Sequence, residues 1–184
     1  MRTARVGVFG GQFDPPHDGH LAVVRAARDQ LSLDRVLVVP DGSPPHRPPS
    51  VLPAETRLRL AEAAFAGEPR VEVQAAATGD RPEYTVHVLE RLAAEGELHL
   101  IIGADQYASF GRWRNPERIR ELASLVVAPR SGYPVSDQAV VVLDMPPVDL
   151  SSTELRERLA AGEDAAGRIP PAAWRLIESG HLYR

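Results

Sequence analysis

Apolar residues along this chain occur either as short continuous runs or at spacings of three and four residues. Short runs predict buried strands, and the wider spacing predicts helices that bury one face. The predicted strands span residues 6–9, 35–40, 70–74, 98–103, 125–130 and 139–144. The predicted helices include residues 21–31 and continue with residues 53–66, 84–95, 116–123, 152–161 and 171–179.

Predicted strands and helices alternate along most of the chain. A helix between two strands allows them to run parallel, with helices covering both faces of the sheet. We therefore expect an α/β fold, a Rossmann-like doubly wound parallel sheet with a small C-terminal helical segment. No repeat or long linker divides the 184 residues, so we expect one domain over 1–184. Residues 41–53 are rich in proline and predict a loop.

The composition excludes several classes of protein. A formal net charge of −4 argues against a nucleic-acid-binding protein. No apolar run approaches the roughly 20 residues of a membrane helix, so we expect no membrane association and a cytoplasmic location. The chain lacks cysteine, which excludes disulfides and thiolate metal sites. All 21 basic residues are arginine, so a cation that contacts phosphate must be arginine, histidine or a metal ion. The oligomeric state stays open, a homo-oligomer included.

The first stretch with candidate chemistry is GGQFDPPHDGH, which follows the first predicted strand. Ligands of parallel α/β sheets bind beyond the carboxyl ends of the strands. Gly10 and Gly11 let the backbone approach a ligand, and the start of the next helix attracts phosphate. His17 and His20 share a helix face across Gly19 and can donate hydrogen bonds to phosphate oxygens. These residues predict a phosphate site, although the same residue types also form ordinary turns.

The second stretch with candidate chemistry is VDLSSTELRERL, near the end of the chain. Ser151 and Glu154 have the S-x-x-E spacing of a helix capping box. Capping does not require Ser152, Thr153 or Arg156, and hydroxyls, free N–H groups and a guanidinium at one helix start form an anion site. Two such helix starts predict that a nucleoside triphosphate binds between them.

Two other common kinds of site fit the sequence poorly. No third ligand stands at a recognisable spacing from the two histidines, so a zinc site is disfavoured and we expect no resident metal. The G-x-G-x-x-G pattern of dinucleotide-binding folds is absent.

The two stretches resemble the two signatures of the nucleotidyltransferase superfamily, (H/T)-x-G-H and S-S/T-x-x-R, in order and separation. The segments between them resemble those of bacterial nicotinate-nucleotide adenylyltransferases, namely VVPDGSPPHR, PEYTVHVLERL, LIIGADQYASFGRW and LVVAPRSGY. The tail IPPAAWRLIESGHLY is similar as well, so the resemblance covers nearly the whole chain. The signatures alone indicate only the superfamily, whereas the intervening segments select the nicotinate branch.

The resemblance implies an enzyme of NAD biosynthesis. It implies that the adenylyl group of ATP passes to nicotinate mononucleotide, which gives deamido-NAD and pyrophosphate. The 5′-phosphate of the acceptor is itself the nucleophile, so catalysis depends on positioning and charge stabilisation. The implied partners are the small molecules ATP and nicotinate mononucleotide, and Mg²⁺ is expected to accompany ATP.

The resemblance also assigns roles to individual residues. The implied catalytic residues are His17, His20 and Arg156. The implied ATP-binding residues are Gly10, Gly11, Gln12, His17, Gly19, His20, Gly103, Asp105, Ser151, Ser152, Thr153 and Arg156. The implied acceptor-binding residues are Phe13, His46, Arg47, Tyr84, Thr85, Trp113 and Arg130. Of these, Trp113 has the alternative of a packed surface aromatic residue, and Arg130 could be either a phosphate contact or an ordinary surface charge.

Three positions depart from the pattern of the family. Gln12 stands where serine or threonine is usual, and Asn115-Pro116 replaces an aromatic residue. Glu83 replaces a serine, and its carboxylate would repel nicotinate unless it points away or pairs with Arg81. Because all three concern the acceptor, alternatives stay open: nicotinamide mononucleotide, another phosphomonoester, or a nucleotide-binding protein without turnover.

Overall fold

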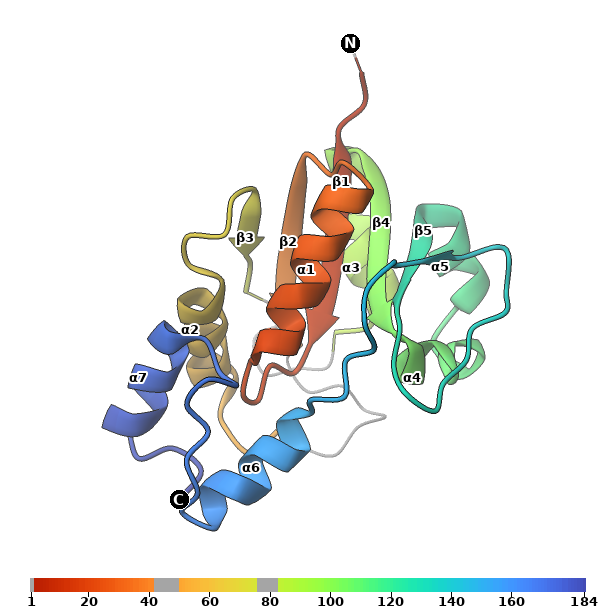
Figure 1. Cartoon of the computed structure of the whole chain (residues 1–184). Coiled ribbons are helices and arrows are strands. Elements are labelled where there is room, and N and C mark those ends of the chain that lie inside the picture. Colours follow the sequence, from red (N-terminus) through yellow and green to blue (C-terminus); the bar gives the residue numbers. More distant parts are fainter. Residues whose placement is uncertain (1, 42–49, 76–82) are drawn as a thin grey trace.

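The fold is described by a computed structural model, which covers residues 2–41, 50–75 and 83–184 (Figure 1). One parallel sheet has the strand order β3-β2-β1-β4-β5-β6. Its strands are β1 (Arg5–Gly11), β2 (Arg35–Pro40), β3 (Val71–Val73), β4 (Glu97–Gly103), β5 (Ala123–Ala128) and β6 (Val141–Val142). The chain moves outward from β1 to β3 and then returns to β4 on the other side of β1, where such sheets bind ligands. The predicted doubly wound α/β fold is confirmed.

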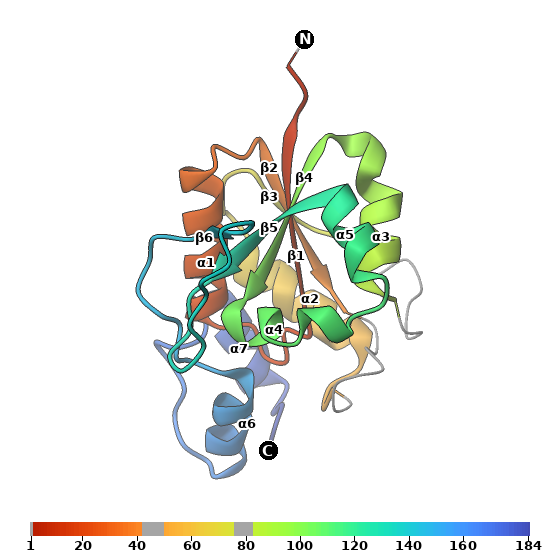
Figure 2. The same ribbon diagram turned by 90° about the vertical axis from the view of Figure 1, so that its right-hand side faces the viewer.

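Helices cover both faces of the sheet, as the edge-on view in Figure 2 shows for α1 on one side and α3 and α5 on the other. The first core contains side chains of α1 (Asp18–Gln30), α2 (Ala54–Phe65), α6 (Ser152–Ala160) and α7 (Pro171–Ser179). The second core contains side chains of α3 (Thr85–Leu92) and α5 (Pro116–Leu122). Phe9 belongs to the first core and Val8 to the second, because successive residues of a strand point to opposite faces.

The carboxyl ends of the strands point toward the same side of the molecule as α6 and the C-terminus (Figure 1). The loop after β1 leads into α1, and β4 continues directly into the short helix α4 (Ala104–Tyr107). The chain that follows β5 and β6 returns to this side and begins α6. The two stretches with candidate chemistry therefore meet at one edge of the sheet.

Several predicted boundaries were wrong. β1 continues through Gly10 and Gly11, which pair with Val39 and Pro40, instead of ending at Phe9. The strand predicted at 139–144 is reduced to two residues, and the helix predicted at 84–95 ends in a 3₁₀ turn, η1 (Ala93–Glu95). The helix α4 and the 3₁₀ turn η2 (Phe110–Arg112) were not predicted. The predicted loop at 41–53 lies mostly outside the described residues. Within the described part of the chain, no helix is long and apolar enough to cross a membrane.

Candidate active site

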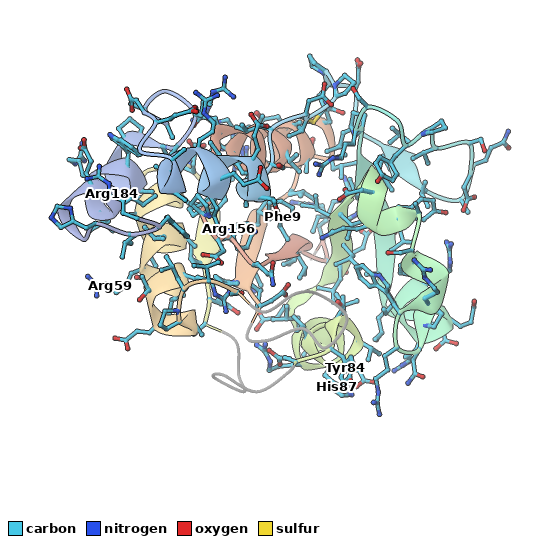
Figure 3. The ribbon with its side chains drawn as sticks, turned by 90° about the horizontal axis from the view of Figure 1, so that it is seen from below. Phe9, Arg59, Tyr84, His87, Arg156 and Arg184 are labelled. Atoms are coloured by element: carbon cyan, nitrogen blue, oxygen red, sulfur yellow. The ribbon has the colours of Figure 1, made fainter. Side chains whose placement is uncertain are left out.

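A cavity of about 290 Å³ lies beyond the carboxyl ends of β1, β4 and β5, and we call it the phosphate cavity after the role predicted for its lining residues. Strand ends and the starts of α1 and α6 supply most of its wall. Figure 3 shows Phe9 and Arg156 close together on this side of the molecule. The lining residues are Phe9, Gly10, Gly11, Gln12, Phe13, His17, Gly19, His20, Val23, Gly103, Asp105, Gln106, Ala128, Pro129, Arg130, Val148, Leu150, Ser151, Ser152, Thr153 and Arg156. Every residue predicted for ATP binding is among them.

The two histidines lie against each other at the start of α1. Their ring centroids are 3.7 Å apart and the rings are nearly parallel, at 23°. Gly19 between them has no room for a side chain, because a Cβ there would lie 2.5 Å from Val148 Cγ1 and 3.0 Å from His17 Nδ1. Val148 belongs to the segment before α6. The glycine thus allows the two signature stretches to pack together.

The hydrogen bonds and burial of the histidines define their protonation. The backbone N–H of His17 donates to His20 Nδ1 at 3.1 Å. A neutral imidazole that accepts at Nδ1 carries its proton on Nε2, so His20 presents an Nε2–H donor. His17 is 4% exposed, and burial together with the charge of Arg130 lowers its pKa to about 4. His17 is therefore neutral at pH 7, and phosphate charge beside it would raise its pKa again.

The first turn of α6 is fixed by its cap. The Ser151 hydroxyl accepts the backbone N–H of Glu154 at 3.2 Å, which is the N-cap half of the predicted capping box. The carboxylate of Glu154 accepts a hydrogen bond from Arg168 at 3.3 Å. Ser151 therefore sets where α6 begins, and this places the N-terminus of the helix in the wall of the phosphate cavity.

Two side chains of α6 connect it directly to the loop after β1. The Ser152 hydroxyl donates to the carbonyl oxygen of Pro15 at 2.8 Å. Arg156 donates through Nη1 to the carbonyl oxygen of Asp14 at 2.6 Å, and through Nη2 to the Thr153 hydroxyl at 3.1 Å. The two signature stretches are thus held together by hydrogen bonds, in addition to lining one cavity.

A second cation lines the phosphate cavity at the end of β5. Arg130 Nη1 donates to Asp105 Oδ2 at 3.3 Å. Asp105 follows Gly103, where a Cβ would lie 2.5 Å from the Asp105 carboxylate oxygen. The sequence interpretation grouped Arg130 with the acceptor, whereas the structure brings it together with the residues predicted for ATP.

A smaller cavity of about 50 Å³ lies beside the phosphate cavity, and we call it the acceptor cavity after the role predicted for its lining residues Thr85 and Trp113. The two cavities share Gly10 and Gln106. The lining of the acceptor cavity consists of Val8, Gly10, Val39, Asp41, Glu83, Thr85, Val88, Leu100, Ile102, Gln106 and Trp113. Tyr84 lies in an adjoining hollow with Thr85 and Trp113, and its ring lies 4.7 Å from the Arg114 guanidinium. The predicted residues Tyr84, Thr85 and Trp113 are therefore gathered in one place.

Other predicted acceptor residues are not found there. The Phe13 ring packs edge-on against His20, with centroids 4.9 Å apart, and lies in the wall of the phosphate cavity. His46 and Arg47 lie outside the described residues. So does Arg81, the partner suggested for Glu83.

The structure shows how two of the departures from the family pattern are accommodated. The Glu83 carboxylate accepts a hydrogen bond from Arg91 at 3.4 Å, and its side chain is only 7% exposed. Asn115 has a φ of 52° just before α5, a left-handed conformation that asparagine tolerates, and Pro116 occupies the first turn of that helix.

The sequence analysis missed two buried charged residues beside the site. The Asp14 carboxylate accepts the backbone N–H of Val51 at 2.6 Å and the Tyr183 hydroxyl at 2.7 Å. Arg57 donates to the carbonyl oxygen of Gln12 at 2.8 Å, and both charged side chains are 1% exposed. An arginine at a core position of a predicted helix, and an aspartate inside a glycine-rich turn, were the available signals.

Comparisons with known proteins agree with this geometry. The cytidylyltransferase-like family matches residues 8–158 of the chain. A protein of Thermus thermophilus named "probable nicotinate-nucleotide adenylyltransferase" is 43% identical over 187 residues, which cover 98% of this chain and 100% of that protein. A protein of a Roseiflexus species with the same name is 38% identical over 200 residues, with full coverage of both chains.

Solved structures show the same fold. The nicotinic acid mononucleotide adenylyltransferase of Plasmodium falciparum, complexed with NaAD, superposes with a TM-score of 0.82 at 14% identity. The superposition covers 98% of this chain and 97% of that one. Given the family match and the identities over nearly full length, the chain belongs to the cytidylyltransferase-like family and, within it, to the nicotinate-nucleotide adenylyltransferases.

Proposed function

We propose that the two neighbouring cavities bind the two substrates of one adenylyl transfer, ATP in the phosphate cavity and nicotinate mononucleotide in the acceptor cavity. The products are deamido-NAD and pyrophosphate, and the reaction is a step of NAD biosynthesis. The observation that carries this proposal is the wall that the cavities share at Gly10 and Gln106. Because the two cavities adjoin at these residues, substrates bound in them can bring their reacting phosphates together there.

The transfer needs no nucleophile from the protein. A 5′-phosphate oxygen of the acceptor attacks the α-phosphorus of ATP and forms the new P–O bond. The bond from the α-phosphorus to the oxygen that bridges it to the β-phosphorus breaks in line, and pyrophosphate leaves with that electron pair. The protein accelerates this step by aligning the two phosphates and by stabilising the charge that develops on the leaving group.

The phosphate cavity offers donors of two kinds for that charge. His17 and His20 are proposed to donate to the ATP phosphates, with the Nε2–H of His20 as one defined donor. Arg130 and Arg156 bring positive charge, and the helix start at Ser152 adds the positive end of a dipole. The Ser152 hydroxyl already donates to Pro15, so its proposed contribution to phosphate binding comes from the backbone.

The acceptor cavity must widen before it can hold a pyridine nucleotide. Its volume of about 50 Å³ is far below the roughly 300 Å³ at which ligand pockets usually begin. Trp113 is its largest lining side chain, and we propose that it moves to stack on the pyridine ring. Thr85 begins α3, whose N-terminus would attract the nicotinate carboxylate.

Magnesium is proposed to enter the site with ATP. Among the described residues, no group of three or more histidine, aspartate or glutamate side chains could hold a metal ion. The ion would therefore be bound mainly by phosphate oxygens and water, as Mg²⁺ commonly is. Its chemical contribution would be to neutralise phosphate charge.

The test is pyrophosphate release with ATP and Mg²⁺, comparing nicotinate mononucleotide, nicotinamide mononucleotide and 4′-phosphopantetheine at equal concentrations. The expected result is a clear preference for nicotinate mononucleotide, because the α3 N-terminus favours a carboxylate and the Glu83 carboxylate is paired with Arg91. Turnover with another acceptor alone would contradict the proposed substrate and leave the transfer mechanism intact. No turnover with any acceptor, alongside measurable ATP binding, would favour a nucleotide-binding protein instead.

A further inference from the structure

The chain near its C-terminus contacts the loop that carries the first signature. The Tyr183 hydroxyl donates to Asp14 Oδ1 at 2.7 Å, although the two residues are 169 positions apart. Asp14 is 1% exposed, so its carboxylate depends on protein donors in place of water. Burial and the neighbouring carboxylate raise the pKa of Tyr183, so the hydroxyl keeps its proton and remains a donor.

All three side-chain and carbonyl oxygens of Asp14 accept hydrogen bonds, each from a different part of the chain. Oδ1 accepts from Tyr183, and Oδ2 accepts the backbone N–H of Val51 at 2.6 Å. The carbonyl oxygen accepts from Arg156 Nη1 at 2.6 Å. Asp14 is therefore the point at which the C-terminal segment, the chain before α2 and the start of α6 are joined.

Asp14 is also connected to both histidines. It lies three residues before His17, which is the residue immediately before α1. Its neighbour Phe13 packs its ring against the ring of His20, with centroids 4.9 Å apart. A displacement of Asp14 would therefore be transmitted to both imidazoles, along the backbone to His17 and through the Phe13 ring to His20.

We propose that Tyr183 is a positioning residue for the adenylyl transfer, because its hydroxyl, acting through Asp14, holds His17 and His20 where they meet the ATP phosphates. This inference rests on the proposed function. Without the hydroxyl, the phosphates still bind to Arg130, Arg156 and the helix starts, but the donors are misaligned for the transition state. The loss therefore falls on kcat more than on KM.

The test compares Tyr183→Phe with a matched control, Tyr133→Phe. Each substitution removes one hydroxyl, but Tyr133 is 44% exposed and lines neither cavity. We expect Tyr183→Phe to lower kcat by about tenfold or more, since misplacement by about 1 Å can cost roughly a hundredfold. KM for the acceptor should stay within about twofold, because the acceptor cavity is untouched. The Tyr133→Phe variant should match the wild type in both parameters.

A second measurement distinguishes positioning from a general loss of stability. The ring signals of His17 and His20 in ¹H–¹³C correlation spectra, assigned with His17 and His20 variants, should shift in Tyr183→Phe and not in Tyr133→Phe. A double-mutant cycle with Asp14→Ala, which removes both carboxylate oxygens, gives a further criterion. Adding Tyr183→Phe to Asp14→Ala should change kcat by less than about twofold, because the hydroxyl acts through that carboxylate.

Several results would overturn the inference. One is a kcat of Tyr183→Phe within about twofold of the wild type. Another is a fall in activity no larger than the fraction of the variant that is unfolded, with the ring signals of the histidines unchanged. The inference would also be contradicted if the factors by which the two single substitutions lower kcat multiply in the double variant. If the wild type itself releases no pyrophosphate, the proposed function fails first, and the ring signals alone then decide whether Tyr183 positions the histidines.

Discussion

The phosphate cavity and the acceptor cavity share a wall, yet they are built in different ways. The wall of the phosphate cavity comes largely from strand ends and helix starts, and Ser152 and Arg156 are bonded across it to the loop after β1. The acceptor cavity is much smaller, and side chains such as Glu83 and Trp113 form much of its wall. On the proposed assignment, strand ends and helix starts would align the reacting phosphates, whereas side chains such as Trp113 would decide which acceptor binds.

The largest effect should come from His20→Ala. The loss of a donor aimed at developing charge should lower kcat by about 10² to 10³. If the phosphate cavity serves the transfer step alone, the substitution should lower kcat by the same factor with nicotinate mononucleotide and with nicotinamide mononucleotide. Pyrophosphate release measures both factors, and circular dichroism during heating checks that the variant is folded. A factor that depends strongly on the acceptor would break the separation between the cavities.

The free energy of unfolding, measured as a function of pH, tests whether His17 is buried in the wall of the phosphate cavity. The pKa of His17 is lowered from 6.5 to about 4, mainly by burial, so the unfolded chain binds the proton more tightly. The free energy of unfolding should therefore fall as the pH falls from 6.5 to 4, by up to about 3 kcal/mol from this group.

The control for the titration is His17→Gln, measured by urea unfolding at pH 7, 5.5 and 4.5. The comparison with this variant is needed because burial also lowers the pKa of His99. The wild type should lose more stability than the variant over this range. Equal losses in the two proteins would mean that His17 is well solvated.

Gly19→Ala should destabilise the junction of the two signature stretches. The added methyl group would lie 2.5 Å from Val148, and overpacking of this kind costs about 1–3 kcal/mol. Gly111→Ala is the matched control, because a Cβ there meets nothing within 4 Å. Urea unfolding should show a loss of stability for the first variant and little change for the second. A Gly19→Ala protein as stable as the control would show that the junction is adaptable.

The smallest effect is expected at the acceptor end, from Trp113→Ala. Loss of the aromatic face should raise KM for nicotinate mononucleotide by about tenfold, since stacking contributes about 0.5–1.5 kcal/mol beyond the buried area. KM for ATP should stay within about twofold, because Trp113 does not line the phosphate cavity. Steady-state kinetics with each substrate varied in turn measures both values. An equal rise in KM for both substrates would contradict the idea that the two cavities act independently.

Local patterns predicted most of the fold because they report local physics. The apolar runs around Val8 and Leu100 lie in central strands buried on both faces, so the runs are continuous and easy to recognise. The edge strand β6 keeps only Val141 and Val142, which are 42% and 43% exposed, and the apolar run there did not define its limits. The helix α4 has four residues, too few to show a helical period. The strand order depends on pairing between distant segments, which no local pattern encodes.

The residues of the candidate site likewise divide into those that local patterns predict and those that depend on distant contacts. The motif residues were found because their spacing places them at helix starts, where phosphate binding has a local cause. Asp14 and Arg57 were missed because their partners lie far along the chain. Asp14 contacts Val51 and Tyr183, which are 37 and 169 positions away, and Arg57 contacts Gln12 at 45 positions. Only the folded arrangement reveals that these side chains support the loop.

The wall shared at Gly10 has a consequence for how such enzymes diverge. Gly10 contributes only backbone to that wall, so substitutions elsewhere in the acceptor cavity leave this part unchanged. Descendants of this chain could therefore gain new acceptors through changes at positions such as Trp113 while they inherit the same transfer step. On the proposed assignment, acceptor choice could change in this way without altering the backbone at which the two cavities meet.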